Sequence, residues 1–191
     1  MIANLVLQTY ATDEAEKLVD ELVSLYLEVH ADEGEFYSEE RYLRQLGAHR
    51  ERNGWQLVTA TVNGVLIAYI YGFPLPPQTR WWEGLNGDVP AGFTDEDGRR
   101  TFAISELLVR AGWRRKGVAR ALHDRLLSGR TEQRATLLVR PDNAIARRAY
   151  DSWGWRQQAR LRPSWENAPE FLVLTTDLPH PTASSTVRAC E

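Results

Sequence analysis

The first part of the chain has apolar positions whose spacing predicts a strand followed by two helices. Residues 4–10 have the pattern of a short strand. Apolar residues then recur at helical spacing, which predicts a helix over residues 13–30 with Asp13 as its N-cap. A second helix is expected to begin at Ser38 and to end near residue 52, before an Asn-Gly pair.

The next part of the chain reads as a β-hairpin followed by alternating strands and helices. Asn63-Gly64 separates two β-rich runs at 55–62 and 65–73, and this pair is the strongest short signal for a hairpin. The elements expected after a loop are a strand at 101–109, a helix at 117–128, a strand at 135–140, a helix at 143–153 ended by Gly154, and two closing strands in 155–162 and 170–178.

Residues 74–100 are expected to form a long loop, because they are rich in Pro, Gly and acidic side chains. One helical turn is predicted within it, at Trp81–Leu85. Loops of this length in a compact domain are usually functional or disordered.

The order of these elements predicts a mixed α/β fold, in which helices cover the faces of a sheet. At least one parallel crossover is expected, between the strands at 101–109 and 135–140. The length suits one domain over residues 1–178, and residues 179–191 have the composition of a disordered tail.

Composition excludes several classes of protein. The formal net charge is −3, with 43% hydrophobic and 26% charged residues, which is typical of a soluble globular protein and argues against a general polyanion binder. No run approaches the ~18 apolar residues of a membrane span, and the N-terminus lacks the pattern of a signal peptide. The single cysteine, Cys190, allows no internal disulfide, and no metal-ligand spacing is present, so a cytoplasmic protein without a metal is expected.

A basic loop precedes the predicted helix at 117–128. Arg114, Arg115 and Lys116 lead into Gly117, which allows a ligand to approach the backbone closely. The free N–H groups and the dipole at a helix N-terminus bind anions, so this junction is a candidate phosphate or pyrophosphate site. An ordinary solvated junction is an equally good interpretation of this stretch alone.

A second candidate lies in the helix at 143–153. Asn143 and Tyr150 are seven residues apart, so they share one stripe of the helix. This arrangement could place the Asn143 amide near the arm of a cofactor and the Tyr150 phenol near its reactive end. The plainer interpretation makes Asn143 a cap and Tyr150 a half-buried aromatic residue.

Together these two segments resemble the GNAT acetyltransferase family. Arg114, Gly117 and Ala119 match its Gln/Arg-x-x-Gly-x-Gly/Ala motif, and the later segment matches its Asn-x-x-Ala-x-x-x-Tyr-x-x-x-Gly-aromatic pattern. The residues that match this second pattern are Asn143, Ala146, Tyr150, Gly154 and Trp155. The resemblance is strong over about residues 100–156.

The resemblance implies an acetyl-CoA-dependent N-acetyltransferase. The implied fold is a mostly antiparallel sheet of about seven strands with about four helices, splayed between 101–109 and 135–140. The cofactor-binding residues it implies are Leu107, Leu108, Val109, Arg114, Arg115, Lys116, Gly117, Val118, Ala119, Arg120, Asn143 and Ala146.

The resemblance also gives Tyr150 the role of general acid toward the departing thiolate. A base for the amine is sought separately. Glu106 shares a strand face with apolar residues, and partial desolvation there would raise its pKa into a useful range. A glutamate paired with an arginine or exposed by a bulge is an equal alternative, and His30, His49 and His123 have weaker claims.

The resemblance implies an amine acceptor, and acidic and aromatic residues gather in two segments that would suit a cationic amine. A solvated acidic surface is at least as good an interpretation of these segments. These candidate contacts are Glu35, Phe36, Tyr37, Trp81 and Trp82. A small molecule such as an antibiotic-like amine is the first expectation, and a protein N-terminus or lysine is the alternative. A non-catalytic acyl-CoA-binding protein and a nucleic-acid-binding module remain as other classes, although the negative net charge disfavours nucleic acid. A monomer or a homodimer is expected.

Overall fold

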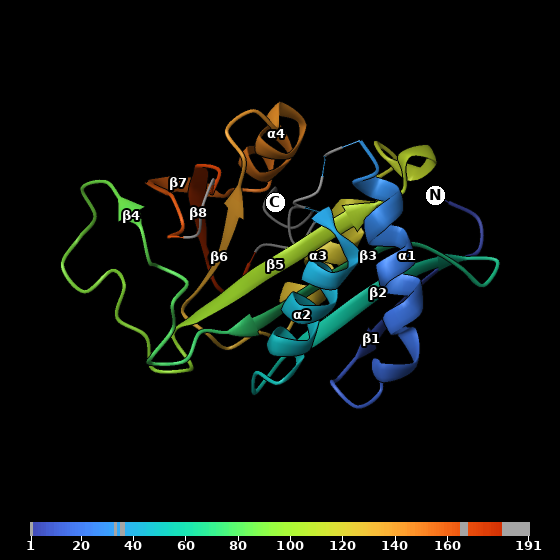
Figure 1. Cartoon of the computed structure of the whole chain (residues 1–191), viewed down its shortest axis with the longest axis horizontal. Coiled ribbons are helices and arrows are strands. Elements are labelled where there is room, and N and C mark those ends of the chain that lie inside the picture. The colour runs from blue at the N-terminus through green and yellow to red at the C-terminus, as the bar shows by residue number, and fades with distance from the viewer. Residues whose placement is uncertain (1, 33, 35–36, 165–167, 181–191) are drawn as a thin grey trace, which may run out of the picture. The chain divides into compact units, whose positions relative to one another are not determined.

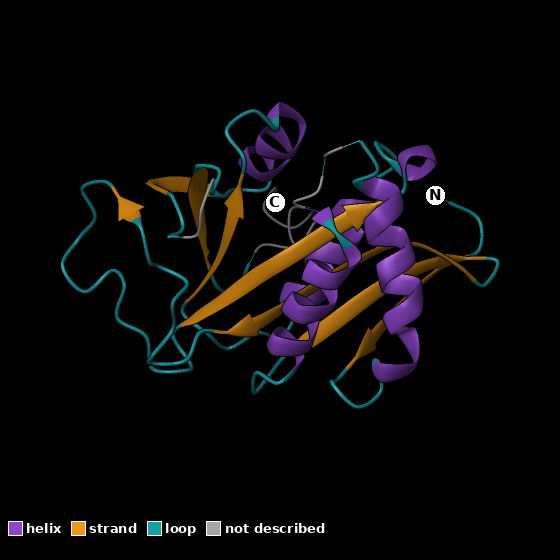
Figure 2. Cartoon of the chain, viewed as in Figure 1, coloured by secondary structure: helices purple, strands orange, loops and turns teal. Residues whose placement is uncertain are grey.

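The computed structural model describes residues 2–32, 34, 37–164 and 168–180. These residues contain eight strands and four α-helices, and most strand pairs are antiparallel (Figures 1 and 2). They divide into two compact units. The first comprises the described residues up to Phe73 together with Ser105–Gly129, and the second comprises Pro74–Ile104 and Arg130–His180. The predicted mixed α/β fold is therefore confirmed.

In the first unit the strands follow the order β1-β2-β3-β5, with helices on both faces. Helices α1 and α2 lie on the face toward the viewer in Figure 1, and α3 lies behind the strands. The bounds are β1 Leu5–Tyr10, α1 Val19–Val29, α2 Glu39–Arg50, β2 Gln56–Val62, β3 Val65–Pro74, β5 Thr101–Val109 and α3 Val118–Leu127. Strand β3 is buried along almost its whole length, as expected for a strand covered on both faces.

Local signals in the sequence set several boundaries of this unit. Asn63 and Gly64 both have positive φ, which is the geometry of the predicted hairpin turn between β2 and β3. The Ser38 hydroxyl accepts a hydrogen bond from the Arg41 backbone N–H at 3.4 Å, so the predicted cap of α2 is confirmed. The helix predicted to begin at Asp13 begins later, since a 3-10 turn at Glu16–Leu18 precedes α1 and Asp13 caps neither.

In the second unit the strands follow the order β5-β6-β8-β7-β4, so the last strand of the chain lies between β6 and β7. The bounds are β4 Leu85–Asn86, β6 Arg134–Val139, α4 Ala144–Ser152, β7 Arg156–Leu161 and β8 Phe171–Asp177. Strands β5 and β6 are parallel, as predicted, and their register joins Thr101–Ile104 to Arg134–Leu137. Each strand continues beyond this register, β5 to Val109 and β6 to Val139.

Residues 74–100 form an ordered segment with a small core of its own. The buried Glu96 carboxylate accepts hydrogen bonds from Thr101 Oγ1 at 2.7 Å, Trp82 Nε1 at 3.2 Å and Arg134 Nη2 at 3.2 Å. Trp82 and Phe93 are buried edge to face, 5.3 Å apart, and the Arg134 guanidinium lies over both rings. The predicted helical turn at Trp81–Leu85 is wrong: a turn leads into β4, which pairs with β7 and is the additional, eighth strand.

Candidate active site

The turn between β5 and α3 is shaped by two residues in the left-handed region of backbone conformation. After a 3-10 turn at Ala111–Trp113, Arg115 has φ 60° and Gly117 has φ 83°. A non-glycine residue with positive φ is uncommon, and left-handed residues in such turns expose successive backbone N–H groups as an anion-binding nest. No side chain of the described residues caps the start of α3. The helix N-terminus is therefore available to an anion.

The space in front of Gly117 is open. A Cβ built on this residue would meet no atom of the described structure within 4 Å. The left-handed backbone therefore favours glycine here, whereas packing within the described structure does not require it. This observation fits the pyrophosphate of acetyl-CoA, which needs close access to backbone amides.

Three of the cations around this turn have partners within the protein. Arg114 Nε donates to the Val109 carbonyl at 3.1 Å, and Lys116 lies 4.9 Å from the centre of the Trp113 ring. Arg120 pairs with Asp124 at 2.8 Å. Arg114, Arg115 and Lys116 remain exposed, so their charges are accessible to an anion at this turn. Of the two residues that follow Gly117, Val118 is buried and Ala119 is half-buried.

Glu106 lies on β5 in a polar and aromatic environment of the first unit. Gln45 Nε2, from α2, donates a long hydrogen bond of 3.4 Å to Glu106 Oε1. Burial raises the pKa of Glu106 to about 7, and the Gln45 hydrogen bond opposes that rise. The raised pKa expected from the sequence is found, and no arginine partner of Glu106 is present among the described residues. Leu107 and Val109 beside it are half-buried, and Leu108 is buried.

Three tyrosines and a histidine complete this environment, and this group was not predicted from the sequence. The Tyr42 and Tyr69 hydroxyls are 2.7 Å apart in the core. His49 Nδ1 lies 3.1 Å from Ser105 Oγ and 3.4 Å from the Tyr71 hydroxyl. Two signals could have found it: Gln45 and His49 are four residues apart on α2, and Tyr69 and Tyr71 are two apart on β3.

Of the histidines considered as alternative bases, His49 belongs to this group, whereas His30 and His123 have other surroundings. Burial lowers the pKa of His49 to about 4, so this residue is neutral near pH 7. His30 stacks on Tyr37 with ring centres 4.1 Å apart. His123 is fully buried, with Nδ1 3.0 Å from Asp124.

In the second unit, Asn143 is the N-cap of α4. Its Oδ1 accepts a hydrogen bond from the Ala146 backbone N–H at 3.0 Å, which is the plainer of the two interpretations of this residue. Tyr150 is buried, and its ring meets Trp153 and Trp155 edge to face at 5.4 and 5.7 Å. Gly154 has φ 89°, as expected for a glycine that ends a helix.

The predicted acceptor contacts separate into three groups. Glu35 and Phe36 lie outside the described residues. Tyr37 is half-buried in the first unit, on the stack with His30. Trp81 and Trp82 belong to the second unit, where Trp82 is packed within the core of the 74–100 segment.

Comparison with known proteins identifies the family. A model of the Acetyltransferase (GNAT) family matches residues 15–155, about three quarters of the chain. The chain belongs to the GNAT acetyltransferase family. It is therefore an N-acetyltransferase that uses acetyl-CoA, as the resemblance of its two motifs implied.

Solved structures share the fold of this GNAT chain at low sequence identity. Ard1 from Thermoplasma volcanium is 20% identical with a TM-score of 0.61, and the match covers 92% of this chain and 98% of that one. The ribosomal-protein-S18-alanine N-acetyltransferase from Escherichia coli is 15% identical with a TM-score of 0.61, covering 91% and 93%. The ribosomal-protein-alanine N-acetyltransferase from Brucella melitensis is 16% identical with a TM-score of 0.63, covering 91% and 99%. No curated protein sequence matches the chain significantly.

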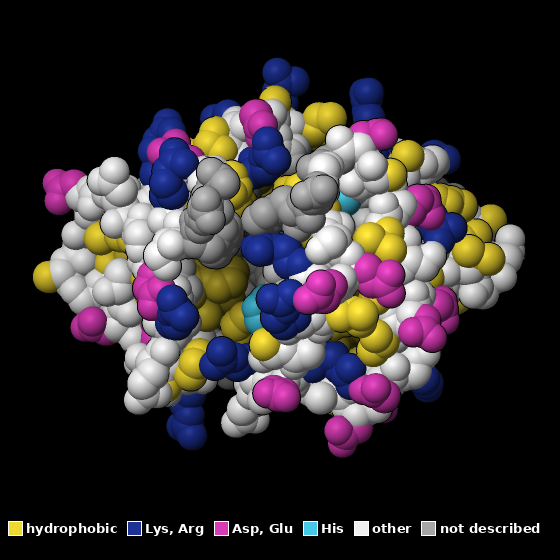
Figure 3. Space-filling model, in the orientation of Figure 1, with side chains coloured by type: hydrophobic (Ala, Val, Ile, Leu, Met, Phe, Trp, Pro, Cys, Tyr) yellow, Lys and Arg dark blue, Asp and Glu magenta, His cyan; other side chains and the backbone are white. Residues whose placement is uncertain are grey.

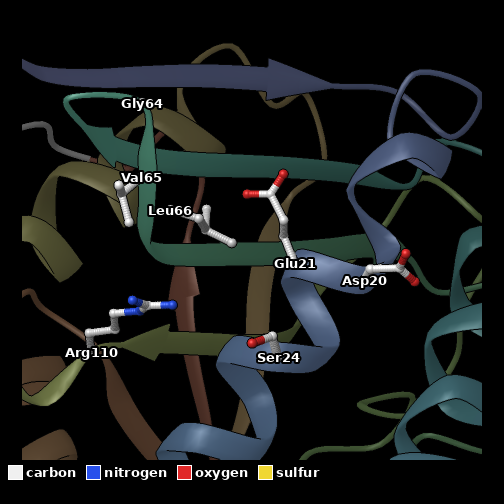
Figure 4. Close-up of a pocket in the computed structure, with 7 residues that line it drawn as sticks. All are labelled: Asp20, Glu21, Ser24, Gly64, Val65, Leu66 and Arg110. Atoms are coloured by element: carbon white, nitrogen blue, oxygen red, sulfur yellow. The ribbon is translucent and has the colours of Figure 1, made fainter.

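A shallow hollow lies in the first unit, and none of the predicted site residues lines it. It is lined by residues of α1, by the β2–β3 turn with the start of β3, and by Arg110, as Figure 4 shows. Arg110 there pairs with Glu28 of α1 at 3.3 Å. None of the helices in the described part of the chain has the length and apolar character needed to cross a membrane.

Proposed function

We propose that this GNAT enzyme acetylates a primary amine by direct attack on the acetyl group, with Glu106 as general base and Tyr150 as general acid. Glu106 carries the proposal, because burial holds the pKa of its carboxyl at about 7. A base whose pKa lies near the working pH can both accept and release a proton. Residues 1–178 are proposed to act as one catalytic domain, since the family match includes parts of both units.

In the proposed reaction, different residues bind the cofactor and transfer protons. The backbone of the turn at Arg115–Ala119 binds the pyrophosphate of acetyl-CoA, and Leu107–Val109 line its arm. Acetyl-CoA supplies a thioester carbon that the amine attacks. Glu106 takes the proton that the attacking amine loses, and Tyr150 donates a proton to the departing thiolate. The products are an acetylated amine and free coenzyme A.

Two classes of acceptor are supported. A small-molecule amine fits the carboxylate and the aromatic rings around Glu106, which suit a compact cation. A protein α-amine is supported by the activities for which several structural neighbours are named. Two of them are named ribosomal-protein alanine N-acetyltransferases, and a third is the NatC complex bound to Gag peptide and CoA.

The alternative of a nucleic-acid-binding module receives no support. On the face shown in Figure 3 the basic and acidic side chains are interspersed, without a continuous basic patch. The net charge of −3 agrees with this.

A turnover screen tests the proposed function. Release of free thiol from acetyl-CoA is followed with kanamycin, spermidine, and peptides that begin with alanine, serine or methionine. Turnover with one of these amines is expected for the wild type. Tyr150→Phe is expected to retain its affinity for CoA in calorimetry and to lose about 100-fold or more in kcat, because it lacks the acidic proton. A variant within about threefold of wild-type kcat would remove Tyr150 from the mechanism.

A further inference from the structure

Glu106 is reached by a side chain of a different element, which the family motifs do not include. Gln45 lies on α2, 61 residues earlier in the chain, and its Nε2 donates to Glu106 Oε1 at 3.4 Å. An amide N–H donor stabilises an ionised carboxylate more than a neutral carboxyl group. A neutral glutamine cannot itself remove a proton from the substrate. Any role it has toward the reaction is therefore exerted through Glu106.

Gln45 also has a polar neighbour on β3. Tyr71 lies near enough to Gln45 and Ser105 for both side chains to lower its pKa, and its hydroxyl lies 3.4 Å from His49 Nδ1. Tyr71 is fully buried. Burial is the larger influence and raises its pKa well above the ordinary value, so the hydroxyl stays protonated. The Gln45 amide therefore lies beside a group that does not titrate near neutral pH.

The remaining groups near Glu106 are also neutral. Burial raises the pKa of Tyr42 on α2 and of Tyr69 on β3, and it lowers the pKa of His49 on α2 to about 4. The influences on the pKa of Glu106 are burial and the Gln45 hydrogen bond, without a charged neighbour. Because no cation of the described residues pairs with it, the amide of Gln45 is the group that can orient the carboxylate.

We infer that Gln45, which lies beside Tyr71, is a positioning residue that orients the Glu106 carboxylate and stabilises its ionised form. Gln45 engages Oε1, which leaves Oε2 to receive the proton of the attacking amine. This inference rests on the proposed role of Glu106 as base. It adds two residues, on α2 and β3, to the machinery of that proposal.

The direct test is the titration of Glu106 itself. The protein is labelled with [δ-13C]glutamate, and the carboxyl signal that disappears in Glu106→Gln is assigned to Glu106. Gln45→Met keeps the length of the side chain but removes the donor, and it is expected to raise the Glu106 pKa by about 0.5 to 1 unit. Gln45→Glu adds a like charge and is expected to raise it further. Gln8→Met, at an exposed position of β1, is the matched control and is expected to leave the titration unchanged.

A purely structural role for Gln45 predicts a different result. If both Gln45 variants fold, as judged by circular dichroism, and titrate within about 0.2 unit of wild type, the inference is overturned. Tyr71→Phe is expected to move the pKa in the same direction as Gln45→Met but by less, because it loosens the amide without removing it. A shift in the opposite direction would contradict the arrangement described.

Kinetics separate this inference from the proposed function. With the amine that the screen shows to be turned over, the acidic limb of kcat/KM against pH is expected to move upward in Gln45→Met by the same amount as the titration, with KM for acetyl-CoA unchanged. If Glu106→Gln keeps the wild-type limb, Glu106 is not the base and the proposed function fails. If Glu106→Gln loses the limb while Gln45→Met leaves it in place, the role of Gln45 fails and that of Glu106 stands.

Discussion

The starts of α3 and α4 carry the two family motifs, but they differ in whether a side chain caps the free backbone N–H groups of the helix. At α3 the preceding residue is Gly117 in a left-handed conformation, and no side chain of the described residues caps the helix. At α4 the Asn143 side chain accepts the Ala146 N–H at 3.0 Å. Arg147 also donates to the Pro141 carbonyl at 2.8 Å, which ties the helix to the preceding turn.

The same contrast appears in the acidic residues of the two regions. Burial raises the pKa of Glu106 to about 7, whereas a hydrogen bond from Arg140 lowers the pKa of the exposed Asp142. In the first region the start of α3 and the Glu106 carboxyl are thus incompletely compensated within the described residues, whereas in the second region the start of α4 and Asp142 each have a compensating partner. Polar or ionisable groups that are not compensated within the protein are the ones expected to bind ligands or transfer protons. We therefore expect the α3 turn and Glu106 to contribute more to function than the start of α4 and Asp142. Substitutions at three positions test this difference.

The largest effect is expected at Gly117. Gly117→Val places a branched side chain in the open space before α3 and strains the left-handed backbone, so the affinity for CoA in calorimetry is expected to fall about 100-fold or more. Gly129→Val is the matched control, because Gly129 has φ 78° and equally open surroundings at the other end of α3. Similar losses of thermal stability are expected for both variants. Equal losses of CoA affinity would show that strain, and not a ligand site, explains the Gly117 result.

A smaller effect is expected in the stability of Glu106→Gln. Because the folded pKa is raised from 4.5 to about 7, the favourable contribution is fully present below the unfolded pKa and is lost as the pH rises through 7. Glu106→Gln is therefore expected to exceed the wild type in free energy of unfolding by about 1 to 3 kcal/mol at pH 8, and to match it near pH 4.5. Urea unfolding at the two pH values measures this.

Asp142→Asn provides the control of opposite sign. The Asp142 pKa is lowered in the folded protein, so its contribution is present above the unfolded value and is lost as the pH falls. This variant is expected to gain no stability at pH 8. A wild type more stable than Glu106→Gln at pH 8 would mean that the ionised Glu106 is compensated by a partner, and the contrast between the two regions would disappear.

Features that depend on a few neighbouring residues could be predicted from the sequence. The Asn63-Gly64 hairpin, the Ser38 cap and the left-handed Gly154 are each determined by local backbone conformation, and each is found where expected. The long-range order of strands could not be predicted in this way. The position of β8 between β6 and β7 depends on pairing between segments far apart in the chain.

The surroundings of the candidate base show the same limit. The spacing of apolar residues predicted a partly desolvated Glu106 with a raised pKa, and the residue is half-buried with its pKa raised to about 7. Its contact with Gln45 joins residues 61 positions apart and could not be read from either segment alone. Composition also failed to distinguish acids at the surface from those in the interior. Glu96, one of the acidic residues of the 74–100 segment, is a buried hydrogen-bond acceptor of Trp82 and Arg134.

The smallest effect is expected at Asn143, where the family motif and the observed geometry predict different roles. Asn143→Ala removes the cap of α4 and is expected to reduce the free energy of unfolding by about 1 kcal/mol, while Asn143→Asp retains a capping oxygen and most of that stability. Affinity for CoA in calorimetry is expected to stay within about threefold of wild type in both variants, since the amide oxygen is already engaged by Ala146. The family motif makes Asn143 a cofactor contact, whereas the geometry makes it a cap. A loss of CoA affinity above tenfold in both Asn143→Ala and Asn143→Asp would instead favour a cofactor contact. Asn143→Asp keeps the helix cap, so loss of the cap could not explain its lower affinity.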